Sequence, residues 1–482
     1  MRIALRTVAA LLFAGVFICA CPLVPLVLLR APEAPARAQA PSAGDRLARD
    51  ILKELIEINT TDSSGSTTQA AEAMAARLRD AGFPAEDVEV LGPNPRKGNL
   101  VARLRGTGAR RPILLLAHSD VVEARREDWS VDPFVLLEKD GYLYGRGTTD
   151  MKDQAASWIA NVILYRQEGF KPNRDLIVAL TADEETGDSN GVQWLLAIHR
   201  DLIDAEYAFN EGGGGLIENG RYLQNNVQAA EKVYLSFRLE VKNAGGHSSV
   251  PPRDNAIYHL ARGLARLADF DFPVRLNEVT RAFFERTARI ETGQMAADMR
   301  ALLAASPDAA AIARLSRSPY YNALMRTTCV PTRLDGGHAD NALPQTAGAL
   351  VNCRLLPDES PVFVQQTLVR VLGDDQISVT PLNKPNQGPP SPLKPDVIGA
   401  LEQVTESMWP GVPVIPVMGT GATDGRELRK AGIPCYGTSG LFEDVDDNRA
   451  HGRDERVGIK QFYEEREYLY RLIKTLASGP RS

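Results

Sequence analysis

The sequence predicts an α/β protein built on a mostly parallel sheet, with a smaller α+β domain inserted into it. Two short and almost solidly apolar runs, 112–117 and 175–181, are typical of strands that are buried on both faces. Stretches with helical periodicity alternate with these strands, which favours a parallel sheet covered by helices. After about residue 229 the strands alternate apolar and polar residues, which indicates a second sheet with one solvent-facing side.

The first part of the chain supplies most of the parallel sheet. Apolar periodicity near 3.6 residues identifies its helices, and short apolar runs bounded by turn residues identify its strands. Helices are expected at 49–59, 69–82 and 151–169, and strands at 88–91, 100–104, 112–117, 175–181 and 206–210. Ligands of such sheets bind beyond the carboxyl ends of the strands, so those ends are the places to search for chemistry.

The inserted domain is expected to contain strands at 234–241 and 347–355 and helices at 255–269 and 361–372. The Ala- and Arg-rich stretch 275–325 is interpreted as a helical extension of this insert.

The chain then returns to the first sheet. Five prolines in 384–395 indicate the returning linker. A strand at 412–417 and helices at 424–431 and 458–477 complete the fold. The predicted boundaries are 44–228 and 386–482 for the first domain and 229–385 for the insert.

Charge and cysteine content exclude several classes of protein. The 482 residues include 55 Lys and Arg against 61 Asp and Glu, a formal net charge of −6, which argues against a nucleic-acid partner. Five cysteines are too few for a disulfide-built scaffold. Cys329, Cys353 and Cys435 lie in the predicted domains, so at most one bridge can form within the chain, and the pattern leaves its partners open. Cys353 falls on the apolar face of its strand and is expected in the core.

The N-terminal segment 1–43 is expected to be a signal peptide or an anchor. Arg2 and Arg6 precede the apolar run 8–29, and an Ala/Pro-rich stretch with an A-x-A site at 36–38 follows it. Retention of the run as a membrane anchor and lipidation at a cysteine are the alternatives. All three place the bulk of the chain outside the cytoplasm. The expected location is secreted or periplasmic, with membrane contact only through this segment if it is retained.

Acidic and imidazole side chains gather at the predicted strand ends and loops. They are His118, Asp120, Asp150, Glu184, Glu185, Glu211 and His451. Several carboxylates in one crevice repel one another unless a cation is present. Imidazole and carboxylate ligands without a thiolate suit Zn²⁺, Co²⁺ or Mn²⁺. Two metal ions bridged by one carboxylate would use this many ligands.

Seven short motifs occur in a characteristic order. They are His118-Ser-Asp120, Gly145-Arg-Gly-Thr-Thr-Asp150, Glu184-Glu185-Thr-Gly, Glu211-Gly-Gly, Gly246-His247-Ser-Ser, Asn341-Ala-Leu-Pro and His451-Gly-Arg. In this order and spacing the sequence resembles the aminoacylase, glutamate carboxypeptidase and succinyl-diaminopimelate desuccinylase family of dinuclear zinc hydrolases, over residues 48–478. The resemblance implies a zinc-hydrolase catalytic domain with an inserted ferredoxin-like lid and dimerisation domain.

The resemblance also implies a role for each matched residue. Asp150 bridges two Zn²⁺ ions, His118 and Glu211 hold one of them, and Glu185 and His451 hold the other. Asp120 lies behind His118, and Glu184 is the general base and acid. Within the insert, His247 stabilises the oxyanion, in its own subunit or in a partner, and Asn341 contacts the substrate. Arg354 binds a substrate carboxylate, and Thr423 and Arg426 belong to a segment near the catalytic crevice.

The expected function is therefore an exported zinc-dependent hydrolase of peptides or N-acyl amino acids that carry a free carboxylate. A carboxypeptidase or dipeptidase is expected first, and an N-acyl amino acid deacylase is the alternative. A non-catalytic binding protein is disfavoured because the ligand set is complete. A homodimer through the inserted domain is implied by the resemblance. One departure is Asp153, which stands where the family usually has Gly and adds a carboxylate near the metals.

Overall fold

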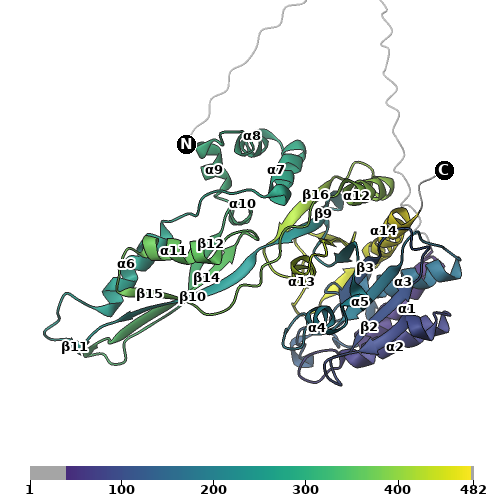
Figure 1. Ribbon diagram of the computed structural model, residues 1–482, viewed down its shortest axis with the longest axis horizontal. Coiled ribbons are helices and arrows are strands. Elements are labelled where there is room, and N and C mark those ends of the chain that lie inside the picture. Colours follow the sequence, from purple (N-terminus) through teal and green to yellow (C-terminus); the bar gives the residue numbers. More distant parts are fainter. Residues whose placement is uncertain (1–39, 479–482) are drawn as a thin grey trace, which may run out of the picture. The chain divides into compact units, whose positions relative to one another are not determined.

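The computed structural model describes residues 40–478 (Figure 1). Nearly all of the predicted signal peptide or anchor, 1–43, lies outside the described residues. Within the described part, no helix is both long and apolar enough to cross a membrane.

A large sheet of ten strands organises the first predicted domain. Its order is β1-β2-β6-β3-β7-β17-β9-β8-β18, and β16 pairs with β9. The strands are β1 (Val88–Leu91), β2 (Asn99–Leu104), β3 (Ile113–His118), β6 (Leu176–Thr181), β7 (Tyr207–Asn210), β8 (Gly213–Glu218), β9 (Arg221–Glu231), β16 (Val414–Gly419), β17 (Cys435–Gly437) and β18 (Phe442–Asp444). The pairs β3–β6, β3–β7, β7–β17, β9–β16 and β8–β18 are parallel, so the predicted α/β class is confirmed.

Helices cover both faces of the large sheet. One core contains Ile113 and Leu115 of β3 together with α1 (Ala43–Glu57), α2 (Thr67–Asp80), α3 (Lys152–Gln167), α12 (Pro395–Met408) and α14 (Ile459–Ala477). The other contains Leu114 and Leu116 with α4 (Gly191–Ile198) and residues at α5 (Arg200–Ile203) and α13 (Gly425–Lys430). All six residues of β3 and all six of β6 are buried, which explains their solid apolar runs.

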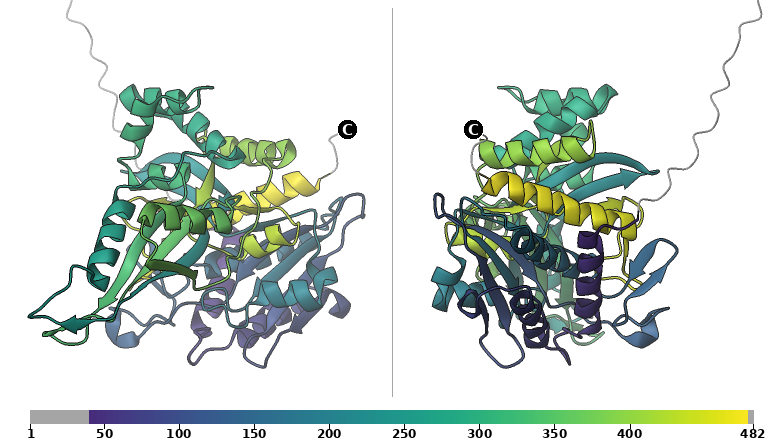
Figure 2. Two further views of the ribbon diagram at one scale, coloured as in Figure 1. Left: turned by 60° about the vertical axis from the view of Figure 1, so that its left-hand side comes forward. Right: turned by 90° about the vertical axis from the view of Figure 1, so that its right-hand side faces the viewer.

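A separate antiparallel sheet forms the insert. Its order is β12 (Thr328–Gly336), β14 (Thr346–Leu355), β10 (Val233–Lys242) and β15 (Ile377–Pro381). Strands β10 and β14 lie against α6 (Ala256–Ala268) and α11 (Pro361–Leu372), in the teal to green part of the ribbon in Figure 2. Apolar side chains of these strands and helices form one core. The opposite face is polar, which accounts for the alternation in the sequence. The chain changes sheets at Lys232, between the end of β9 and the start of β10.

The helical stretch 275–325 packs differently from the expectation that it extends the insert. It forms α7 (Glu278–Ile290), α8 (Gly293–Leu302), α9 (Ala309–Leu315) and α10 (Pro319–Met325). Phe283 and Phe284 belong to the same core as Ile415 of β16, and Arg286 Nη1 donates to the Val414 carbonyl at 2.8 Å. The apolar face of α7 therefore packs against the large sheet. Helical periodicity predicts such a face but does not show which part of the protein it packs against.

Other features lie beyond the sequence prediction. Residues 213–231, for which the sequence predicts no element, form the hairpin β8–β9. A three-stranded sheet joins β4 (Leu137–Lys139), β5 (Tyr142–Tyr144) and β19 (Arg456–Gly458). Cys353 is buried as expected, and it forms a disulfide with Cys329, its register partner on β12. Cys435 is buried as a free thiol.

Candidate metal centre

The predicted donors meet at one edge of the large sheet. His118 is the last residue of β3, Glu184 and Glu185 follow β6, and Glu211 follows β7 directly. Because β3, β6 and β7 are parallel neighbours, their carboxyl ends lie side by side. Two further donors come from loops: Asp150 precedes α3, and His451 lies between β18 and β19.

The carboxylate of Asp150 lies between the two imidazoles. Its Oδ1 is 3.1 Å from Nε2 of His118, and its Oδ2 is 2.9 Å from Nε2 of His451. His451 Nε2 also lies 2.9 Å from Oε1 of Glu185, and His118 Nε2 lies 3.9 Å from Oε1 of Glu211. The donors thus form two groups that share Asp150.

The donor set fits divalent metal ions. Ligand atoms of His118, Glu184 and Glu211 lie within 4.8 Å of one another, and so do those of His118, Asp150 and Glu185. Glu185 belongs to the second triple with His118, but its closest imidazole is that of His451, at 2.9 Å. Oε1 of Glu211 is buried with no hydrogen-bond donor. A buried carboxylate oxygen that has no hydrogen-bond donor and lies beside an imidazole is suited to bind a cation.

The environment of the donors shifts several of their pKa values upward. Burial raises the pKa of Glu211 well above its ordinary range and that of Glu184 to about 8. The hydrogen bond to Asp150 raises the pKa of His451 to about 9. Protonated imidazoles and neutral carboxyls neutralise such a cluster, and divalent cations do so as well by binding the neutral imidazole and the ionised carboxylate.

Asp120 lies behind His118 and fastens the ends of two strands. Its Oδ1 and Oδ2 accept the backbone N–H groups of Glu184 and Glu185 at 3.2 and 3.0 Å. His118 Nδ1 lies 3.0 Å from the Asp120 carbonyl oxygen and 3.6 Å from its Oδ1. The hydrogen bond that orients the imidazole therefore goes to the backbone of Asp120, and the carboxylate instead fixes the Glu184–Glu185 turn.

Asp424 lies between Thr423 and Arg426 in the segment that the resemblance places near the crevice, and the sequence pattern assigns it no role of its own. The structure shows it as a buried carboxyl beside the cluster. Its side chain accepts a hydrogen bond from Asn190 Nδ2 at 2.6 Å, and Thr181 Oγ1 lies 3.4 Å from its other oxygen. Burial raises the pKa of Asp424 to about 6. Its place directly before α13 resembles an ordinary helix start, which hides it in the sequence.

His247 and Asn341 are not brought to the metal centre. His247 lies in β11 (Gly246–His247), which pairs with β13 (Ala342–Leu343) in a small ribbon of the insert. Both residues are exposed, and the Ser249 hydroxyl contacts His247 Nδ1 at 2.8 Å. Within the described residues, neither side chain contacts a donor of the cluster.

Two of the predicted substrate-binding residues, Thr423 and Arg426, are hydrogen-bonded to glutamates, and a third, Arg354, lies beside an aromatic ring. Thr423 donates through its N–H and its hydroxyl to Glu231, at 3.0 and 2.7 Å, and Arg426 Nε donates to Glu427 at 3.1 Å. Arg354 lies on the polar face of the small sheet, with its guanidinium carbon 4.9 Å from the Tyr234 ring centre.

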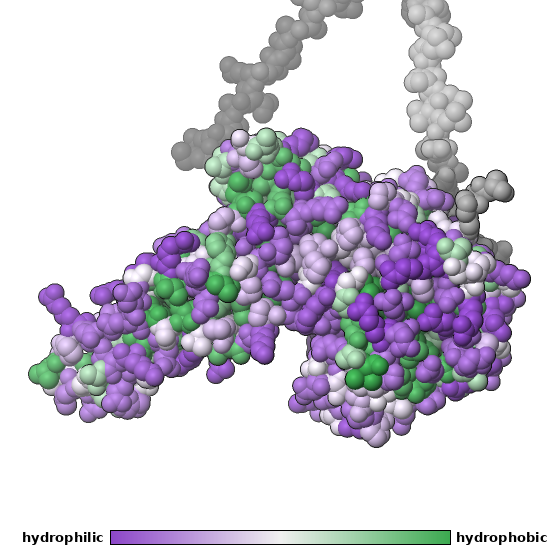
Figure 3. All heavy atoms as spheres, viewed as in Figure 1, coloured by the Kyte–Doolittle hydropathy of each residue, from purple (hydrophilic) through white to green (hydrophobic). Residues whose placement is uncertain are grey.

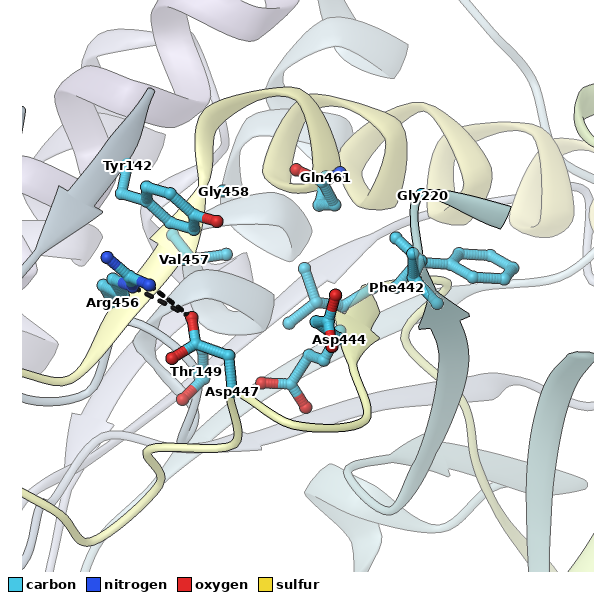
Figure 4. A pocket seen from close by; sticks show the side chains of 13 residues that line it. Tyr142, Thr149, Gly220, Phe442, Asp444, Asp447, Arg456, Val457, Gly458 and Gln461 are labelled. Atoms are coloured by element: carbon cyan, nitrogen blue, oxygen red, sulfur yellow. Dashed lines mark hydrogen bonds and ion pairs between the residues drawn. The ribbon is translucent and has the colours of Figure 1, made fainter. Parts of the chain in front are cut away.

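A separate pocket lies beside the loop that carries His451 (Figure 4). Its lining includes Thr149, Glu443 and Asp447, and Asp447 Oδ2 pairs with Arg456 Nη2 at 2.6 Å. None of the six donors lines it, so this hollow is distinct from the metal centre.

The fold and the donor set define a metal-dependent hydrolase, and comparison with known proteins gives its family. Residues 114–475 match the sequence profile of Peptidase family M20/M25/M40, and the chain belongs to this family. This confirms the resemblance and the prediction of a hydrolytic enzyme.

One relative and two solved structures illustrate the similarity. The chain is 31% identical over 370 residues to the N-fatty-acyl-amino acid synthase/hydrolase PM20D1 of Xenopus tropicalis, covering 73% of this chain and 71% of the relative. An M20 family metallo-carboxypeptidase from Sulfolobus solfataricus superposes with a TM-score of 0.64 at 18% identity, over 89% of this chain and 99% of that one. A dinuclear metal-binding peptidase of the M20 family from Bacillus subtilis gives 0.57 at 13% identity, over 90% and 99%.

Proposed function

We propose that the protein hydrolyses the amide bond of N-acyl amino acids that carry a free carboxylate, with two Zn²⁺ ions at the metal centre. Co²⁺ or Mn²⁺ would suit the same ligands. The observation that carries the proposal is the shared carboxylate of Asp150, with one oxygen near His118 and the other near His451. The similarity to an N-fatty-acyl-amino acid synthase/hydrolase supports the choice of substrate.

The chain's own residues supply the acid–base steps. Two bound divalent ions would act as Lewis acids toward the amide carbonyl and toward water. Glu184 adjoins His118 and Glu211 and is partly exposed, so a substrate can reach it. In the proposal Glu184 takes a proton from the attacking water and delivers it to the leaving amine. Asp120 holds this glutamate in place through its backbone N–H.

Arg354 is the proposed partner of the substrate carboxylate. A guanidinium binds a carboxylate with two parallel hydrogen bonds. Its Nη1 lies 3.5 Å from the Thr420 carbonyl, so the side chain reaches toward the loop 420–423 that follows β16. The ring of Tyr234 limits its freedom from the other side.

A carboxypeptidase is the second candidate. The similarity to the Sulfolobus metallo-carboxypeptidase favours it, since that structure covers nearly the whole chain. Both reactions cleave an amide next to a free carboxylate and require the same metal centre. They differ only in whether the amino acid that is released was joined to an acyl chain or to a peptide.

A panel of substrates tests the proposal. We would measure amine release from N-acyl amino acids with short and long acyl chains and from dipeptides, in Zn²⁺ with and without a chelator. Chelator-sensitive release from the acyl pool is expected. Release from dipeptides alone would make the protein a peptidase, and release that withstands chelation would contradict the metal mechanism.

Export is part of the proposal and is supported by the Cys329–Cys353 disulfide, since such bonds persist mainly in oxidising compartments. Fusion of residues 1–43 to a reporter is expected to export it, with retention in a membrane as the alternative. A cytoplasmic reporter would overturn this part.

A homodimer through the insert is also proposed. β12 is an edge strand of the small sheet, and seven of its nine residues are exposed. Such an edge is available for pairing with a second copy. His247, exposed in the same insert, would then act on the partner's metal centre. Light scattering in solution should give twice the mass of one chain, and a monomer would contradict the proposal.

A further inference from the structure

One pair of strands anchors two loops of the metal centre. Strand β5 pairs with β19, with Tyr144 opposite Arg456. Residues 145–150, here called the Asp150 loop, follow β5. Residues 445–455, the His451 loop, precede β19. The pairing therefore fixes the bases of both loops but leaves their tips to be placed by other contacts.

The side chain of Glu455, at the end of the His451 loop, connects this loop to the Asp150 loop. It is fully buried, and its Oε2 lies 2.6 Å from Nη1 of Arg146. Its Oε1 accepts the N–H groups of Gly147 and Thr149 at 3.1 and 2.8 Å and lies 3.2 Å from the Thr149 hydroxyl. Every partner of this carboxylate belongs to the Asp150 loop.

Arg146, in the Asp150 loop, contacts the backbone of the His451 loop. Its Nη2 donates to the Gly452 carbonyl at 2.9 Å and lies 3.5 Å from the His451 carbonyl. His451 has φ 61°, in the left-handed region that a histidine rarely adopts. Such a conformation persists only where surrounding contacts hold it. Arg146 supplies such contacts at the carbonyl groups of His451 and Gly452.

We propose that Glu455 is a positioning residue that, through Arg146, sets the separation of Asp150 and His451 and so the metal affinity of the group formed by His451 and Glu185. This inference rests on the proposed dinuclear site. We call the contacts of Glu455 and Arg146 with the two loops the clamp. The other group depends less on the clamp, because only its shared ligand Asp150 lies on a clamped loop, whereas His118 ends β3 and Glu211 follows β7 within the large sheet. The predicted consequence of breaking the clamp is therefore unequal loss of the two metal positions.

The buried setting makes the clamp sensitive to a change of charge. The Arg146 side chain is 3% exposed and that of Glu455 is 0% exposed. Removing one charge of a buried pair leaves the other without compensation. Glu455→Gln keeps the shape of the side chain but turns an amide group toward Arg146. Arg146→Lys keeps the positive charge but loses the planar fork that reaches both Glu455 and Gly452.

Zn²⁺ titration of the full-length, chelator-treated protein tests the proposal. The wild type should bind two ions per chain. In Glu455→Gln one position should keep its affinity and the other should weaken at least tenfold, and Arg146→Lys should show the same asymmetry. Glu206→Gln is the matched control, because Glu206 Oε2 pairs with the fully buried Arg174 at 2.8 Å before β7, at the opposite ends of the strands. It should leave both affinities unchanged.

Three outcomes would overturn the inference. Unchanged affinities in both clamp variants would show that the loops are placed without Glu455. Equal weakening of both positions would show a general structural role. A wild type that binds fewer than two ions would remove the proposed function together with the inference, whereas the first two outcomes leave the proposed function intact. Arg146→Lys, which buries no uncompensated carboxylate, decides the matter if Glu455→Gln does not fold.

Discussion

Oδ2 of Asp150 lies 2.9 Å from Nε2 of His451, a residue from the opposite end of the sequence. The other oxygen of the same carboxylate faces His118. The carboxylate therefore has one oxygen in each donor group, which is the arrangement that a bridging ligand requires.

Replacement of the proposed general base should separate catalysis from metal binding. We expect Glu184→Gln to keep the metal content and to lower kcat by about 10²–10⁴-fold, because Gln cannot accept and return a proton. Steady-state kinetics and metal analysis of the same sample check this. Asp188→Asn, an exposed change in the same loop, is the control. Retained turnover in Glu184→Gln would remove this residue from the mechanism.

Loss of the proposed carboxylate partner should affect substrate binding. Arg354→Ala should raise KM by about 10-fold or more for substrates with a free carboxylate, since an ionic hydrogen bond contributes about 1.5–3 kcal/mol. The corresponding amides should be little affected. Arg333→Ala, on the exposed edge strand β12 of the same sheet, should leave KM unchanged. An unchanged KM in Arg354→Ala would place the carboxylate site elsewhere.

Stability should depend on pH through a buried carboxyl pair. Glu465 of α14 is fully buried, and burial followed by the charge of Asp153 raises its pKa well above the ordinary value. The unfolded state loses this proton near pH ~4.3, while the folded state keeps it, so folding stability decreases as pH rises above that value.

Glu465→Gln removes this penalty and should stabilise the protein more at pH 8 than at pH 5, because the raised pKa of Glu465 penalises the folded state increasingly as pH rises. Urea unfolding at the two pH values measures the difference. Glu467→Gln, a partly exposed change on the same helix, is the control. A difference that does not vary with pH would contradict a titrating Glu465.

Removal of metal should destabilise the fold. Saturating ions stabilise a protein by about 2.7 kcal/mol at 100 times their dissociation constant, and chelation also leaves four carboxylates with only two imidazoles. We expect the melting temperature to fall by several degrees in chelator and to recover with Zn²⁺ or Co²⁺. Equal recovery with Mg²⁺, which prefers oxygen ligands, would argue against imidazole coordination.

The donors of the metal centre could be predicted from the sequence because their positions follow from local patterns. His118 ends a solid apolar run, and Glu184, Glu185 and Glu211 come just after two others. Parallel neighbouring strands carry such residues to one edge without any knowledge of the loops. His451 lacks this signal and was identified only through its motif.

The remaining features depend on contacts between distant segments. The sequence does not specify which apolar surface α7 packs against, and the structure places it on β16. Nor does it specify which two cysteines pair, and the structure joins Cys329 to Cys353. Glu455 and Arg146 are charged residues that a sequence pattern assigns to the surface, yet both are buried. Asp153, noted in the sequence as an extra carboxylate near the metals, proves to face Glu465 of α14.

The metal content of Asp150→Asn compared with the wild type tests the central claim most directly. The wild type should contain two Zn²⁺ ions per chain after loading and desalting. Asp150→Asn should retain at most one, since an amide offers a single neutral oxygen where two anionic oxygens face the two groups. Two ions firmly held by a folded Asp150→Asn variant would contradict the shared carboxylate.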